Sequence, residues 1–397
     1  MFSGRLAVRP KRRHKSTSSG KIALKTLSDC RKRHQQCRQR REAKKQAKRT
    51  PRLTGKAETA AARNAFEQVR RKLNGHIYNL TVHPGFASFV PPALFHLHDN
   101  YEATLNFLTE FQYNFGLSKR YLCGDGIERP VYADFGAIED ISAGAGLVLA
   151  AEIHNYASAL RQRPIIHDHK WHENVRAFFI DAGLFPLLNI DPHDIASKPP
   201  SGEERRTLQF RNGRSRSGAD ADGLIAGLKH VIGRDLGHRR VVYDAIAEAL
   251  ANVEHAYPYW FRRWPRASST RWWASGFWAP GRQTVGIQLY DRGAGIPATL
   301  PRKPHYVRLR QIVDPERTAA GLIAAALEYG RTSTGQRGRG RGLAEMSNWI
   351  EKTNSGFLRI LSGGGSVTFS PGKRIAKVNH NVPFPGTLVE WEVSLNA

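Results

Sequence analysis

The stretch 241–257 reads VVYDAIAEALANVEHAY and constrains the fold most, because it encodes a helix with a polar stripe. Its alanines favour helix, and interspersed Ile, Leu and Val residues supply apolar faces. Glu248, Asn252 and His255 stand at positions i, i+4 and i+7, within roughly 60° of one another around the helix axis. A carboxylate, an amide and an imidazole on one stripe suit a bound cation with a water beside it. The alternative is a solvated polar face with a capping histidine.

The length of 397 residues predicts more than one core, and 40% hydrophobic residues are enough for globular packing. No apolar run approaches the roughly 20 residues of a membrane span. The first residues are charged and have no apolar core of the kind that marks a secretory signal. Three cysteines cannot form a disulfide framework, so we expect reduced thiols and a cytoplasmic protein.

Positive charge is concentrated at the start of the chain. Residues 1–60 hold 20 of the 61 Lys and Arg but only three acidic residues. With few large apolar side chains to offset ordering entropy, residues 1–57 are predicted to be a disordered basic tail. Such a tail can bind nucleic-acid phosphates non-specifically and in a salt-sensitive way, or attach to another anionic surface. The alternative is a solvated tail without a partner.

Alternating strand and helix patterns follow, and they predict a small α/β domain over residues 75–195. The strands are expected at 131–135, 164–167 and 184–188, and the helices at 144–156 and 173–182. Pro, Gly, Ser and charged residues in 195–217 mark a boundary. Thr207–Phe210 is expected to be an edge strand of a second domain over 203–397.

The first of these domains resembles the STAS domain of anti-sigma-factor antagonists. The resemblance rests on a strand, the turn Asp140-Ile-Ser-Ala-Gly144 and the helix that follows. It implies that Ser142 is a phosphoacceptor for a partner kinase. The alternative, which we favour, is that Ser142 caps its helix and satisfies a free N–H group.

Several histidines and cysteines are candidate metal ligands. His154, His167, His169 and His172 lack a fixed ligand spacing, which favours structural or surface roles. Cys30, His34 and Cys37 do not match a common zinc spacing either, and they cannot close a tetrahedral site alone.

Three glycine-containing motifs follow the polar helix. The strand 284–290 leads into Asp291-Arg-Gly293-Ala-Gly295, where a carboxylate and an open backbone can meet a flat ring. The run GQRGRGRGL, residues 335–343, precedes a predicted helix whose N-terminus can bind an anion. Its glycines alternate with arginine, which also fits a flexible loop that binds nucleic acid. Gly386-Thr387 opens the predicted strand LVEWEVSL.

In this order the motifs resemble the N, G1, G2 and G3 boxes of the GHKL ATPases, the family of gyrase, Hsp90, histidine kinases and MutL. The form Glu-x-x-x-Asn-x-x-His is most similar to that of anti-sigma-factor serine kinases. The resemblance implies a Bergerat α/β sandwich with a mixed sheet, with ATP held under a lid over 299–337. It assigns the residues as follows: Glu248 as the catalytic base, Asn252 as the Mg²⁺ ligand, His255 to the N box, Asp291 to the adenine amine, and Gly293, Gly295, Gly338, Gly340, Gly342, Gly386 and Thr387 to nucleotide binding.

The expected function is therefore an ATP- and Mg²⁺-dependent regulatory protein, either an ATPase or a protein serine kinase of the anti-sigma type. The resemblance leaves open a protein partner of the STAS or sigma-factor type and a homodimer. The alternative is an ATP-gated switch that binds nucleic acid through its tail, in genome maintenance or defence. A third interpretation is a nucleotide-binding scaffold without turnover, against which the presence of Glu248 argues.

Overall fold

The computed structural model describes segments that all belong to one compact unit, Thr59–Ala397. The predicted tail, residues 1–57, lies outside the described residues, as do Gly338 and Gly340. The described segments are 80–82, 84, 87–116, 120–122, 128–160, 166–193, 205–214, 218–260, 271–302, 306–307, 309, 318–332 and 342–395.

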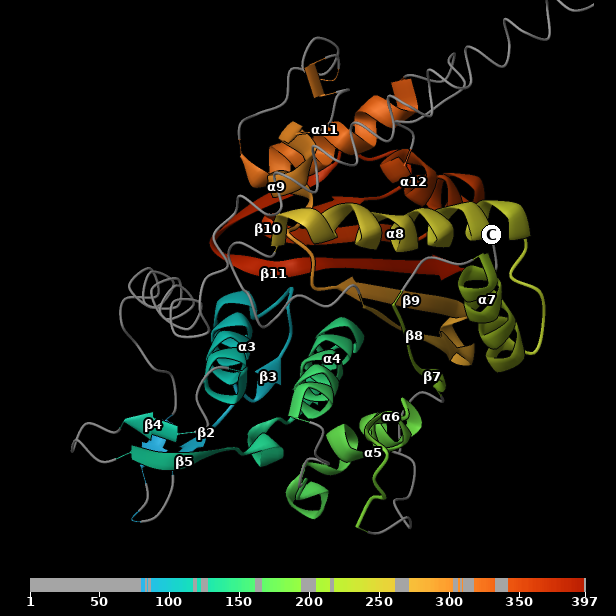
Figure 1. Ribbon diagram of the computed structural model, residues 1–397. Coiled ribbons are helices and arrows are strands. Elements are labelled where there is room, and N and C mark those ends of the chain that lie inside the picture. The colour runs from blue at the N-terminus through green and yellow to red at the C-terminus, as the bar shows by residue number, and fades with distance from the viewer. Residues whose placement is uncertain are drawn as a thin grey trace, which may run out of the picture. The chain divides into compact units, whose positions relative to one another are not determined.

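A five-stranded sheet forms the centre of the molecule, in the order β10-β11-β9-β8-β7 (Figure 1). The strands are β7 (Arg206–Gly213), β8 (Trp272–Ala279), β9 (Thr284–Asp291), β10 (Phe357–Phe369) and β11 (Ala376–Ser394). Every residue of β8 and β9 is buried, which explains their long apolar runs. The predicted strand at 207–210 is confirmed as β7, at the edge of the sheet.

The expected mixed sheet is wrong for these strands, because each neighbouring pair among them is antiparallel. β8 and β9 form one hairpin, and β10 and β11 form another. β9 and β10 run in the same direction and are joined by a helical crossover, but β11 lies between them. The predicted strand LVEWEVSL is the second half of β11, and the antiparallel order of the sheet follows from its place between β9 and β10.

One face of this sheet is covered by α7 (Gly218–Ile232), α8 (Arg239–Trp260), α9 (Ile296–Thr299), α11 (Ala319–Thr332) and α12 (Gly342–Thr353) (Figure 1). α8 packs against α7, α9 and α12, while α11 and α12 pack against β10 and β11. The predicted helix at 241–257 is confirmed as the central part of α8. The second half of the expected lid is α11, whose apolar residues are part of this core.

The opposite face is covered by the segment that precedes β7. Its helices are α3 (Tyr101–Gly116), α4 (Ala143–Leu160), α5 (Glu173–Asp181) and α6 (Leu184–Leu188). α4 packs on β8 and β9, and α6 packs on β7. Their side chains share one core with Phe210, Trp273 and Tyr290 of the sheet. The two predicted parts, 75–195 and 203–397, therefore meet across an apolar interface.

Short strands complete this segment. β1 (Leu80–Val82), β2 (Ala87–Phe89), β4 (Arg120–Leu122) and β5 (Glu128–Ala133) form a sheet in the order β1-β2-β5-β4, and β3 (Leu94–Phe95) pairs with β6 (Asp140–Ile141). The helices predicted at 144–156 and 173–182 are confirmed as α4 and α5. The strand predicted at 184–188 is wrong, because these residues form α6. Of the strand predicted at 164–167, the described residues 166 and 167 are not in a strand.

Candidate functional site

The polar stripe of α8 is retained in the structure and lies partly buried. Glu248 and Asn252 are both intermediate in exposure. The Nδ2 atom of Asn252 is fully buried and has no hydrogen-bond partner among the described residues. His255 lies within α8, but its side chain falls outside the described residues. Because a buried unpaired amide costs free energy, Asn252 marks a place where a ligand or a bound water can complete the structure.

Asp291 ends β9 with its carboxylate almost completely buried, at 3% exposure. Oδ1 accepts a hydrogen bond of 2.6 Å from the backbone N–H of Gly293. Thr387 of β11 lies directly opposite in the strand register and also bonds to the carboxylate. Burial nevertheless raises the pKa of Asp291 to about 7, because these two bonds offset only part of the lost hydration.

Ser362 of β10 joins the three segments around Asp291, and the sequence analysis missed it. Its hydroxyl accepts from the N–H of Ile296 at 2.8 Å and donates to the carbonyl of Gly386 at 3.1 Å. It also lies 2.9 Å from the hydroxyl of Thr387. The complete burial of Ser362 is visible only in the structure, because the sequence offers no signal for it in a strand that also contains Arg359, Ser366 and Thr368.

Two of the predicted glycines hold this arrangement through their backbone. Gly386 has a φ of +104°, and a Cβ built there would lie 1.9 Å from the carbonyl oxygen of Asp291. Gly295 has a φ of +82° and a Cβ there would lie 3.0 Å from the Ser362 hydroxyl oxygen. Gly386-Thr387 lies inside β11, which begins at Ala376, so its predicted place at the start of a strand is wrong.

The glycine-rich run leads into α12, as predicted. Gly342 is the first residue of that helix. α12 lies against α8 and α11, so its N-terminal end belongs to the same helical layer as the polar stripe. Gly338 and Gly340 lie outside the described residues, and their predicted role stays a prediction.

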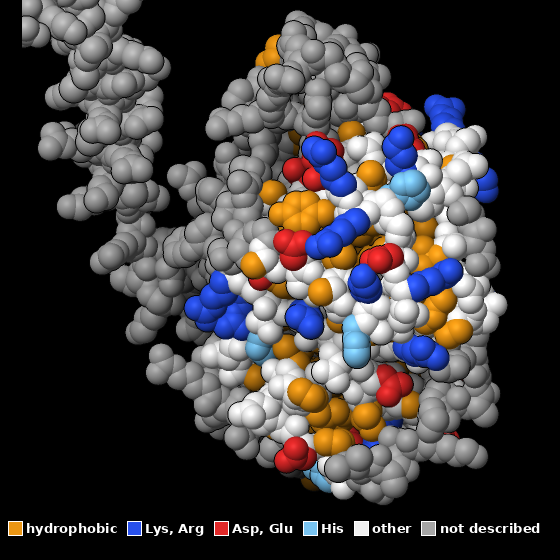
Figure 2. Space-filling model, turned by 90° about the vertical axis from the view of Figure 1, so that its right-hand side faces the viewer, with side chains coloured by type: hydrophobic (Ala, Val, Ile, Leu, Met, Phe, Trp, Pro, Cys, Tyr) orange, Lys and Arg blue, Asp and Glu red, His pale blue; other side chains and the backbone are white. Residues whose placement is uncertain are grey.

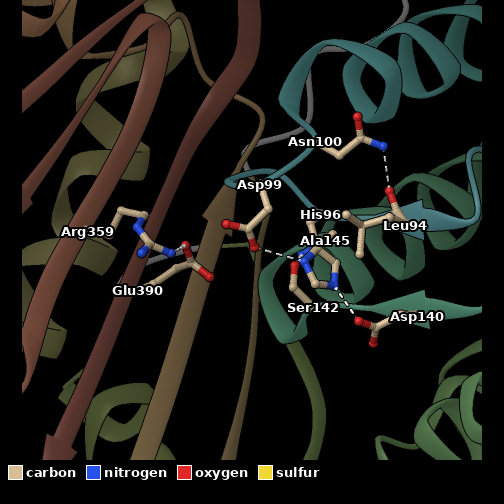
Figure 3. A network of polar contacts seen from close by, with 9 residues as sticks. All are labelled: Leu94, His96, Asp99, Asn100, Asp140, Ser142, Ala145, Arg359 and Glu390. Carbon is tan, nitrogen blue, oxygen red and sulfur yellow. Dashed lines mark hydrogen bonds and ion pairs between the residues drawn. The ribbon is translucent and has the colours of Figure 1, made fainter.

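Ser142 stands at the N-terminus of α4, on the other face of the sheet (Figure 3). Its hydroxyl accepts from the N–H of Ala145 at 3.3 Å, and its carbonyl accepts from Gly146 at 2.8 Å. This is the capping geometry that the sequence analysis favoured. Nearby, the ring of His96 lies between two carboxylates. Its Nδ1 atom is 3.0 Å from Oδ2 of Asp99, and its Nε2 atom is 3.3 Å from Oδ2 of Asp140.

Arg292, the residue after Asp291, reaches the opposite face of the sheet. Its Nε atom lies 3.1 Å from Oε1 of Glu152 on α4, and the side chains are 4% and 3% exposed. The hydroxyl of Tyr290 donates to the same carboxylate oxygen at 3.0 Å. Burial raises the pKa of Glu152, while Arg292 and Tyr290 counteract that rise. The side chains of the consecutive residues Asp291 and Arg292 therefore lie on opposite faces of the sheet.

The candidate histidines have different surroundings in the structure. His154 is structural, as predicted: its Nδ1 accepts from Trp273 Nε1 at 3.0 Å, and burial lowers its pKa to about 4. His167 and His169 instead lie beside His193, which the sequence analysis did not consider. The sequence shows the pair His167-Asp-His169. Only the fold shows that His193, 24 residues onward, lies beside this pair.

Comparison with protein-family models, curated proteins and solved structures found no match to this chain. Among the helices that the structure describes, none combines the length and the apolar character needed to cross a bilayer.

Proposed function

We propose that residues 203–397 form a GHKL-type domain that binds Mg-ATP. The observation that carries the proposal is the buried Asp291 carboxylate, held by Gly293 and Thr387 at the end of the central strand β9. A fully buried carboxylate without a cationic partner is costly. Such a group is retained where it has a recognition role, and here the position matches the adenine-binding Asp of the family that the sequence resembles.

The adenine end of the proposed site is built from hydrogen-bond acceptors in a rigid frame. Asp291 accepts from the exocyclic amine of adenine when its carboxylate is charged. The hydroxyls of Thr387 on β11 and Ser362 on β10 lie 2.9 Å apart and join these two strands beside Asp291. Gly386 brings its backbone against the backbone carbonyl of Asp291, so β11 fixes the position of the Asp291 main chain.

The phosphate end is assigned to α8 and to the start of α12. The buried amide of Asn252 can present its oxygen to Mg²⁺, a cation that prefers oxygen ligands, and the ion then supplies charge neutralisation at the phosphates. The unpaired Nδ2 atom fits this role, since amide oxygen and nitrogen are interchangeable in assignment. The free N–H groups at Gly342 favour an anion at the N-terminus of α12.

Glu248 lies one helical turn before Asn252 and is the proposed general base. It orients or deprotonates the attacking hydroxyl, either of water or of a serine side chain. The proposed activity is therefore ATP hydrolysis or protein serine phosphorylation, with the anti-sigma-type kinases as the most similar class. The STAS resemblance of residues 75–195 stays a prediction on which the nucleotide site does not depend.

Calorimetry with the full chain tests the binding. We expect Mg-ATP to bind the wild type and to bind Asn252→Ala at least about tenfold more weakly. The matched control is Asn174→Ala, at an exposed position of α5. Equal ATP affinity in both variants would contradict the assignment of Asn252.

Turnover is tested separately with Glu248→Gln, which keeps the shape of the side chain and removes the base. We expect this variant to bind Mg-ATP but to lose phosphate release and protein labelling. Mass spectrometry of the chain after incubation with Mg-ATP distinguishes a kinase, which gains phosphate on a residue, from an ATPase. If the wild type binds ATP but releases no phosphate and labels no protein, the domain is a nucleotide-binding scaffold.

The second candidate is an ATP-gated nucleic-acid-binding switch, favoured by the 20 Lys and Arg in residues 1–60. On the described face in Figure 2, Lys and Arg side chains are interspersed with Asp and Glu rather than gathered in one patch. In this second candidate function, the basic tail binds the nucleic acid. It predicts salt-dependent DNA or RNA binding that changes with ATP and is lost when residues 1–57 are deleted.

A further inference from the structure

Three histidines from two separate segments, one before α5 and one after α6, lie close together. His167 directly precedes the short helix η2 (Asp168–Lys170), His169 lies within it, and His193 follows α6 after the turn at Asn189. One ring nitrogen from each of the three lies within 4.8 Å of the other two. The ring centroids are 4.9 Å apart for His169 and His193, and 5.8 Å apart for His167 and His169.

The side chain of Asp168 is fully buried and contacts this cluster through His193. One carboxylate oxygen bonds the Nδ1 atom of His193, and the other accepts from Nε of Arg176 at 3.0 Å. The backbone N–H of His193 also approaches both oxygens at 3.3 Å.

This arrangement orients His193 as metal-binding histidines are oriented. A carboxylate that accepts from Nδ1–H fixes the tautomer and leaves the Nε2 lone pair for a metal. Arg176 pairs with Asp168, so the carboxylate acts as a support for His193, and the three imidazoles act as ligands. His167 and His169 are exposed and can adjust their rings without moving the core.

We propose that His167, His169 and His193 form a Zn²⁺ site with a water as the fourth ligand. Three histidines and one open position are a typical tetrahedral zinc arrangement. Bonds of about 2.0–2.1 Å require ligand atoms roughly 3.4 Å apart, so the exposed rings close by about 1 Å on binding. The bound ion connects η2 to the segment after α6 and closes the chain around α5 and α6, which pack on β7.

Zinc titration of the full chain tests the proposal, using metal-free protein purified without a polyhistidine tag and without ATP. We expect about one Zn²⁺ per chain in isothermal titration calorimetry, lost in both His169→Ala and His193→Ala. His172→Ala is the matched control, since this exposed histidine lies outside the cluster, and it should keep full affinity. Cys30→Ser/Cys37→Ser should also keep the site.

The supporting role of Asp168 is tested with Asp168→Asn, which we expect to weaken Zn²⁺ binding about 10- to 100-fold. Because Asp168 is buried, circular dichroism establishes that the variant is folded. The visible spectrum of the Co²⁺-substituted chain is a second readout, with strong tetrahedral bands in the wild type and none in His169→Ala. Absence of Zn²⁺ binding, or equal binding by His169→Ala and wild type, would overturn the proposal.

Discussion

The two faces of the central sheet differ in how they are packed. On the face covered by α8, α11 and α12, the core is largely aliphatic. On the face covered by α3 to α6, it is rich in aromatic rings, including edge-to-face pairs such as Phe135 with Trp171. Neighbouring strand residues divide between the faces: Trp272 belongs to the first core and Trp273 to the second. A sheet buried on both sides thus combines two cores with separate compositions.

The faces also differ in their polar groups. The aromatic face contains the buried ion pair of Glu152 and Arg292, which connects α4 to the end of β9. The other face contains the unpaired amide of Asn252 on α8. Asp291 is the last residue of β9 and directly precedes Arg292. The ion pair therefore distinguishes the two faces, whereas unpaired buried polar atoms occur on both of them among the described residues, as Thr104 Oγ1 on α3 shows.

The largest expected effect comes from breaking the ion pair. Glu152→Ala leaves Arg292 charged and buried without its partner, and should lower the free energy of unfolding by about 3–5 kcal/mol. Arg240→Ala, which removes an exposed pair with Asp244 at 3.9 Å, should cost at most about 0.5 kcal/mol. Urea denaturation measures both. A Glu152 variant as stable as the Arg240 variant would show that this pair does not hold α4 to the end of β9.

The next effect is a pH dependence at Asp291, whose pKa is about 7 in the folded protein against an ordinary 3.8. A raised pKa gives stability that is complete below about pH 4 and is lost as pH rises to about 7. Wild type should therefore lose about 4 kcal/mol relative to Asp291→Asn over this range. Denaturation of both proteins at several pH values checks the difference. Parallel curves would contradict the burial of a protonated Asp291.

A smaller effect is expected from Gly386→Ala, because the new Cβ would collide with the backbone of Asp291 and φ is +104°. We expect a loss of about 2–3 kcal/mol and weaker nucleotide binding. Gly372→Ala, at a φ of +63° with nothing within 4 Å, tests the backbone strain without the collision and should cost about 1 kcal/mol. Thermal unfolding and calorimetry compare the two. Equal losses of stability and of nucleotide affinity in the two variants would contradict the proposed contact between β11 and the site.

The smallest effect is that of Ser142→Ala, on the aromatic face. Loss of the cap should cost about 1 kcal/mol. Ser158→Ala, within α4, is the control and should change stability little. The same variant addresses the phosphoacceptor interpretation: if Ser142→Ala abolished protein labelling by Mg-ATP, Ser142 would be a substrate as well as a cap.

The sequence predicted the long periodic elements well, because their patterns are local. α4, α5 and α8 each carry enough turns for the apolar period to be recognised. The run LFPLL of α6 is too short for that, and the left-handed Gly183 and Asn189 that bracket it became visible only in the structure. Ser362 and His193 were missed for another reason: both act through contacts with distant segments.

The central claim is that Asp291 recognises an adenine amine, and side-by-side titration with Mg-ATP and Mg-GTP tests it most directly. Guanine presents a carbonyl oxygen where adenine presents its amine, so the carboxylate should reject it. We predict that wild type binds ATP at least about 100-fold more tightly than GTP, and that Asp291→Asn loses most of this preference. Equal affinity for the two nucleotides in the wild type, or no nucleotide binding at all, would contradict the account.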